Sequence, residues 1–176
     1  LYLPVTNSTW FKWGSIVAVG LALWAYTGPA RQVPGLYNSP DEATNAVYAQ
    51  QFAEHSDLAL PHPVDAGSEN EFLHPRSSFA DFGAYSLPVG FWGLPVFYGS
   101  LTNSFGQWAL PYLTPLLAII AVLASVRLWQ VIFPGVSRAG LLVVALSLPS
   151  IWYYAARPLL PNLPFTALVL IGAVWL

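Results

Sequence analysis

Residues 108–133 read WALPYLTPLLAIIAVLASVRLWQVIF, and they form the clearest candidate for a membrane span in this chain. The run is apolar almost throughout, and its one charged residue, Arg127, lies near its end. A helix needs about 20 apolar residues to cross the hydrocarbon core of a bilayer. We therefore predict a transmembrane helix here.

Two further apolar runs flank this one in the sequence. The first, Trp10–Tyr26, carries Lys12 in its opening turn and is just long enough to span, since spans usually have about 17–25 residues. A signal peptide would end at a small-residue cleavage site. The sequence Thr27-Gly28-Pro29-Ala30 is a poor one, so we favour a retained transmembrane helix. The second run, Ala139–Ala156, follows the tight turn Pro134–Arg138 and predicts another span.

The composition agrees with a protein that has lipid as part of its solvent. Hydrophobic residues make up 56% of the chain and charged residues only 8%, whereas soluble domains have about 25% charged residues. Aromatic residues reach 15%, which suits membrane interfaces. The net charge of −2 is too small to suggest a nucleic-acid partner, and the absence of Cys excludes disulfides and thiolate metal sites.

The segment from residue 28 to residue 81 is different in kind, because it is polar. It contains all eight acidic residues of the chain, which are Asp41, Glu42, Glu54, Asp57, Asp65, Glu69, Glu71 and Asp81. It also contains all three histidines, which are His55, His62 and His74. Any chemistry must be sought in this segment.

The topology depends on residues 82–101, which are aromatic and apolar but interrupted by Pro and Gly. Such a sequence is a poor straight helix, so it either spans or lies broken at the interface. Basic residues prefer the cytoplasmic side in short loops. If residues 82–101 do not span, then Arg127 and Arg138 share the cytoplasmic side with Lys12, and the loop Arg157–Pro164 faces the acidic segment outside. We prefer this arrangement.

The sharpest local signal is Ser39-Pro40-Asp41-Glu42-Ala43. Ser39 and Glu42 have the spacing of a capping box, and Pro40 fits the first helical position. A surface helix from Pro40 to Ser56 is therefore predicted, with Asp41 in its first turn. The simplest interpretation of Asp41 and Glu42 is that their charges complement the helix dipole.

An N-terminal span followed by an outer loop that opens with Asp-Glu at a helix start resembles the GT-C superfamily of membrane glycosyltransferases, which includes protein O-mannosyltransferases and aminoarabinose transferases. Further segments are similar to that family in sequence order. They are Leu58-Ala59-Leu60-Pro61, Phe72-Leu73-His74-Pro75-Arg76, Phe105-Gly106 and Arg157-Pro158-Leu159-Leu160-Pro161-Asn162. Two departures stand out, because Arg76 replaces a Pro and Asn162 stands where many relatives have Asp.

The resemblance implies an inverting transfer of a sugar from a polyprenyl-phosphate donor to an acceptor on the outer side of the membrane. Asp41 would be the general base that takes the acceptor proton. The phosphate leaving group would be stabilised by positive charge or hydrogen-bond donors, for which His74, Arg76 and Arg157 are candidates. Glu42 and Asn162 are further candidates for substrate binding.

Each candidate also has a structural interpretation. Glu42 can close the capping box, His74 can bond to backbone, and Arg76 can pair with Glu69 or Glu71. Arg157 can anchor at the headgroups. A divalent metal stays open as a cofactor, although Asp65, Glu69, Glu71 and His74 match no strong metal motif.

The sequence thus predicts an all-α, multi-pass integral protein of the cell membrane. Its parts are a transmembrane helix over residues 1–27, an outer loop with short interfacial helices over 28–107, and transmembrane helices over 108–176, the last one truncated. We expect the chain to be the N-terminal part of a longer enzyme, inactive alone, whose partners are membrane lipid, the lipid-linked sugar, and the remainder of the same chain or another membrane subunit. The alternative is a non-catalytic accessory subunit of a membrane complex.

Overall fold

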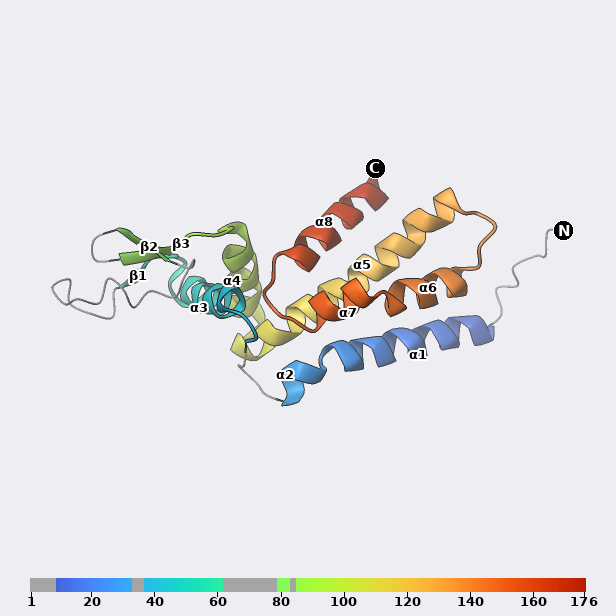
Figure 1. The fold of residues 1–176 in the computed structure, drawn as a ribbon, viewed down its shortest axis with the longest axis horizontal. Coiled ribbons are helices and arrows are strands. Elements are labelled where there is room, and N and C mark those ends of the chain that lie inside the picture. Colours follow the sequence, from blue (N-terminus) through green and yellow to red (C-terminus); the bar gives the residue numbers. More distant parts are fainter. Residues whose placement is uncertain (1–8, 33–36, 62–78, 83–84) are drawn as a thin grey trace. The chain divides into compact units, whose positions relative to one another are not determined.

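The computed structural model describes residues 9–32, 37–61, 79–82 and 85–176 (Figure 1). These residues are mostly helical, as the sequence predicts. They divide into two compact units. We call them the helical unit (Leu1–Pro34, Thr114–Ala156 and Asn162–Leu176) and the α/β unit (Gly35–Leu113 and Arg157–Pro161).

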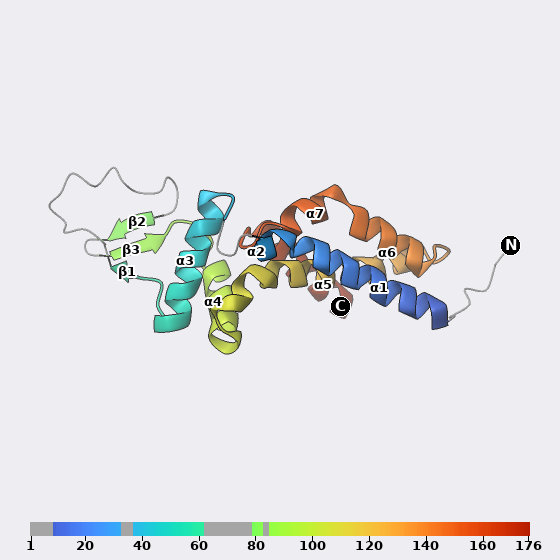
Figure 2. The same cartoon turned by 90° about the horizontal axis from the view of Figure 1, so that it is seen from below.

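The helical unit is built from α1 (Thr9–Tyr26), α2 (Gly28–Gln32), most of α5 (Leu110–Ile132), α6 (Arg138–Ser147), α7 (Pro149–Ala155) and α8 (Asn162–Trp175). Helices α1 and α6 lie side by side (Figure 2). The first turn of α1 and the turn between α5 and α6 lie at the same end of this unit (Figures 1 and 2).

Small and branched side chains form the core of the helical unit, including Ala22, Ala118 and Ala145. Tyr26 is buried among them, donates its hydroxyl to the Leu146 carbonyl at 3.1 Å, and packs edge-on against Trp152. A buried tyrosine generally needs such a partner for its hydroxyl. These contacts join α1 to the α6–α7 region.

One described helical stretch, Gln107–Ile132, is long and apolar enough to cross a membrane. It comprises the 3₁₀ turn η2 (Gln107–Ala109) and α5. The stretch Trp13–Tyr26 of α1 is apolar but shorter, and so is α8.

The predicted span Ala139–Ala156 consists of two helices rather than one straight helix. Helices α6 and α7 are bent by 58° at Leu148, which precedes Pro149. A residue before proline is pushed out of the helical region, and Leu148 accordingly has φ −62° and ψ 123°. The two helices count as one span only if the bent pair is taken together.

The α/β unit adds a small sheet to a chain that is otherwise mostly helical, consistent with the all-α prediction. It contains a three-stranded antiparallel sheet in the order β1-β3-β2, made of β1 (Leu60–Pro61), β2 (Phe79–Phe82) and β3 (Tyr85–Pro88). The strands are two to four residues long, too short for a clear alternating pattern in the sequence. β1 pairs with a strand that is distant along the chain, Leu60 with Ser86, whereas β2 and β3 are consecutive and pair locally, Phe82 with Tyr85.

The α/β unit also contains helices α3 (Pro40–His55) and α4 (Gly93–Phe105). Residues 85–101 are therefore a strand followed by a helix rather than one continuous helix. Pro95 is tolerated because it lies in the first turn of α4. Gly99 brings α4 very close to α3: a Cβ placed there would lie 2.6 Å from the Ala49 carbonyl oxygen and 2.9 Å from the Phe52 Cβ.

Candidate functional site

The first turn of α3 confirms the cap predicted from the sequence. Ser39 has extended dihedral angles (φ −141°, ψ 156°), and its hydroxyl accepts the Glu42 N–H at 3.3 Å. Pro40 occupies the start of the helix. The reciprocal half of the capping box differs from expectation, because the Glu42 carboxylate accepts the N–H of Asn38, one residue before the cap, at 3.1 Å.

Glu42 also forms an ion pair with Arg157, which is distant in the sequence. Its side chain is fully buried, and its Oε1 accepts the Arg157 Nε–H at 2.9 Å. The side chain of Arg157 is 20% exposed. A buried carboxylate is very costly unless it is paired and hydrogen-bonded, and Glu42 receives bonds on both of its oxygens.

The pKa of Tyr37 is affected by the environment of this turn. Burial raises the pKa of the Tyr37 phenol above its ordinary value of 10.0, and the negative charge of Glu42 raises it further. Both effects disfavour the phenolate form. Tyr37 therefore remains a neutral phenol over the whole physiological range.

Arg157 opens a short second segment, residues 157–161, which is attached to α3 at two points. Besides the Glu42 ion pair, the Asn45 amide donates to the Leu159 carbonyl at 2.8 Å. Glu42 and Asn45 are three residues apart, so they share a helix face. Leu159 is fully buried and has φ of +69°, a conformation that is strained for a residue other than glycine.

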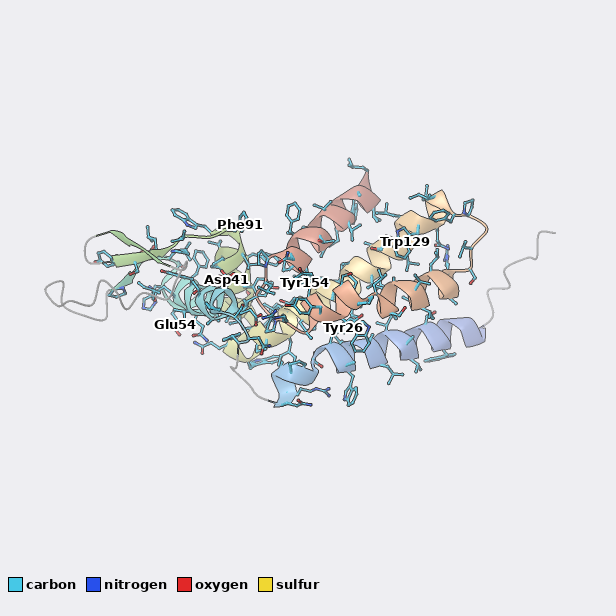
Figure 3. All side chains as sticks on the ribbon, in the orientation of Figure 1. Tyr26, Asp41, Glu54, Phe91, Trp129 and Tyr154 are labelled. Atoms are coloured by element: carbon cyan, nitrogen blue, oxygen red, sulfur yellow. The ribbon has the colours of Figure 1, made fainter. Side chains whose placement is uncertain are left out.

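A cleft of about 260 Å³ lies beside this attachment. It is lined by residues of α3, of the segment from β3 into α4, and of the second segment, namely Asp41, Thr44, Asn45, Pro88, Gly90, Phe91, Leu94 and Pro161. Asp41 is the only ionisable residue among them, and its side chain is exposed. Phe91 is 77% exposed and lies just ahead of α4 (Figure 3).

The structure thus separates two neighbouring carboxylates. Asp41 faces an open cleft, whereas Glu42 is buried and paired with Arg157. An exposed carboxylate at a cleft can accept a proton from a bound hydroxyl. A buried carboxylate with both oxygens bonded instead holds the backbone and Arg157 in place.

Of the other predicted site residues that the structure describes, Asn162 is not among those that line the cleft. His74 and Arg76 lie outside the described residues, as do Asp65, Glu69 and Glu71. Asn162 is exposed at the start of α8 and belongs to the helical unit, while its neighbour Pro161 lines the cleft. Within the described ranges, no group of three His, Asp or Glu side chains is placed to hold a metal ion.

Sequence reasoning missed the Glu42–Arg157 pair and the roles of Asn45 and Phe91. The helical periodicity does place Asn45 on the same face as Asp41, four residues later. The pair with Arg157 leaves no local signal, because its partners lie 115 positions apart.

No protein-family model matches this chain, and neither a curated protein nor a solved structure matches it.

Proposed function

We propose that this chain is the catalytic-loop portion of a multi-pass membrane glycosyltransferase that takes a sugar from a polyprenyl-phosphate donor. The observation that carries the proposal is the exposed carboxylate of Asp41 in a cleft where no other ionisable side chain of the described residues lies. Its position at the start of α3 agrees with the resemblance to the GT-C superfamily.

Membrane placement is supported by the surface of the helical unit. Gln107–Ile132 is long and apolar enough to cross a bilayer. Helix α1 exposes large apolar side chains, including Trp13, Leu21 and Trp24 at 62–64%. A helix that is apolar all round suits either a protein interior or lipid, and these side chains are mostly exposed in the part of the chain that the structure describes.

In the proposed reaction, the acceptor hydroxyl attacks the anomeric carbon of the donor sugar as Asp41 takes its proton. The new carbon–oxygen bond forms on the face opposite the phosphate. The bond between the sugar and the phosphate oxygen breaks, and its electron pair leaves with the polyprenyl phosphate. The configuration at the anomeric carbon is thereby inverted.

Glu42 is a positioning residue in this scheme. Its bond to Arg157 fixes the guanidinium beside the first turn of α3 through Nε. A guanidinium has five N–H donors, and one of them is used by this bond. The negative charge of Glu42 also offsets much of the positive charge of Arg157. The leaving phosphate therefore needs further positive charge, for which His74 and Arg76 are the candidates.

The proposal is tested by transfer activity of the full-length parent in membranes supplied with labelled polyprenyl-phosphate sugars. We expect Asp41→Asn to reduce activity by at least a factor of about 100, the lower range of a lost general base. Glu54→Gln is the matched control, because Glu54 is an exposed acid on the same helix outside the cleft.

Each outcome has a distinct meaning. Loss in Asp41→Asn alone, at equal expression, supports the general-base role. Retained activity returns Asp41 to a purely structural role in the first turn of α3. No transfer by any of the proteins favours the non-catalytic accessory subunit.

A further inference from the structure

A second cavity, of about 440 Å³, lies in the helical unit at the junction of α5 and α6. One face of α5 lines it with Leu123, Val126, Arg127, Gln130 and Val131, and Arg138 at the start of α6 completes it. The α5 residues recur at intervals of three and four, so they form one continuous helix face. Two guanidinium groups therefore share one cavity with apolar walls.

Neither arginine is neutralised by the part of the chain that the structure describes. The guanidinium groups of Arg127 and Arg138 form no hydrogen bond or ion pair within the described residues. The sequence ranges of the helical unit contain no Asp or Glu at all, because the eight acidic residues all lie between positions 41 and 81. Like charges around one cavity repel, so an anion there would be stabilised by both.

The other described arginine of the helical unit is in a different situation. Arg31 donates to the Trp24 carbonyl, and its guanidinium lies 4.5 Å from the centre of the Trp24 ring. This cation–π contact packs the Arg31 guanidinium against the Trp24 ring. Arg31 does not line this cavity and is therefore the reference cation of the helical unit.

We propose that the cavity at the α5–α6 junction binds the phosphodiester headgroup of an anionic membrane phospholipid. Arg127 and Arg138 would bind the phosphate oxygens, and the amide of Gln130 would bond to the polar linker. The start of α6 adds the positive end of its helix dipole beside Arg138. Basic pockets between membrane helices are suited to anionic headgroups.

The apolar part of the lining favours a lipid over a soluble phosphate. Leu123 is 48% exposed and Val131 is 79% exposed on the same face of α5 as the arginine. These side chains offer a continuous apolar path for an acyl chain next to the headgroup site. This inference rests on the membrane placement of the helical unit, but it does not depend on sugar transfer.

The test uses the purified full-length protein in nanodiscs of phosphatidylcholine with a minor fraction of phosphatidylglycerol. Native mass spectrometry then counts the lipids that each protein retains. We expect the preference for phosphatidylglycerol to fall about fivefold in Arg127→Gln or Arg138→Gln and about thirtyfold in the double variant. Arg31→Gln is the matched control and should keep the preference.

Two further measurements keep the test sharp. The conservative double variant Arg127→Lys with Arg138→Lys should retain most of the preference, because it keeps both charges. Inorganic phosphate in excess should not displace the lipid, and displacement would overturn the assignment to a lipid. An equal preference in the double glutamine variant and in Arg31→Gln would overturn the site itself.

Discussion

At the first turn of α3, two adjacent acidic residues have opposite environments. Asp41 is exposed in a cleft, whereas Glu42 is fully buried and bonded to Arg157 and to the Asn38 N–H. Adjacent positions on a helix point in different directions, so one can face inward while the other faces solvent. The sequence motif alone does not distinguish these roles, because both residues suit a first turn.

Replacing Glu42 should therefore be far more damaging than replacing Asp41. Removing one partner of a buried ion pair costs about 3–5 kcal/mol, and the partial exposure of Arg157 places Glu42→Ala near 3 kcal/mol. Asp41→Ala should cost less than about 1 kcal/mol, because it loses only an exposed helix-dipole interaction. Thermal unfolding of the purified protein measures both, and equal losses would contradict the pairing.

Tyr37 gives a prediction of pH dependence. Its folded pKa lies above the ordinary value of 10.0 through burial and then the charge of Glu42. Because the unfolded chain releases this proton first, Tyr37 contributes its stability fully below pH 10.0, and the contribution is lost as the pH rises towards the folded pKa.

The phenolate absorbance during alkaline titration checks this assignment. In Tyr37→Phe the absorbance of the late-ionising phenols should fall by the contribution of one tyrosine. In Glu42→Gln the pKa of Tyr37 should move to lower pH but remain above 10.0, because burial is the larger cause. Its complete return to the ordinary value would show that Glu42, not burial, controls the pKa.

Helices α3 and α4 pack closely together at Gly99. A methyl group there would overlap the Ala49 carbonyl, which is backbone and cannot easily move. Helix propensity alone favours alanine over glycine by about 1 kcal/mol. The close contact reverses this preference, which the sequence of α4 cannot reveal.

Gly99→Ala should therefore destabilise the α/β unit by about 1–3 kcal/mol, the usual cost of overpacking. Gly93→Ala is the matched control, since Gly93 lies in the same helix and a Cβ there meets nothing within 4 Å. Protease resistance of the purified protein compares the two. A neutral Gly99→Ala would mean that α3 and α4 can separate without loss.

At the scale of the whole molecule, the proposed topology places the start of α1 and the α5–α6 turn on one side of the membrane. These two parts lie at the same end of the helical unit (Figure 1). The residue pattern that predicted this placement is the distribution of Lys12, Arg127 and Arg138. The proposed topology also puts α3 on the opposite, outer side.

These 176 residues contain no cysteine, so a cysteine introduced at a chosen position within them can report this topology. We expect Gly135→Cys, in the α5–α6 turn, to react with an impermeant thiol reagent only after the membrane is opened. His55→Cys, exposed at the end of α3, should react in intact cells. Labelling of both from the same side would reject the proposed arrangement.

By itself, the sequence determined the structural features that depend on neighbouring residues. The cap at Ser39, the start of α3 at Pro40 and the apolar helix after Trp108 depend on neighbours within a few residues, so their patterns are visible in one dimension. The break before Pro149 had a local cause too, yet the apolar run around it predicted one helix.

Only the tertiary structure decided which partners meet over long separations. The pairing of Glu42 with Arg157, the bond from Asn45 to Leu159 and the strand pairing of Leu60 with Ser86 join residues that are far apart in the chain. Such contacts depend on how the elements pack, and many residue pairs have equally suitable chemistry. The cleft at Asp41 belongs to this second class, because three separate segments must come together to line it.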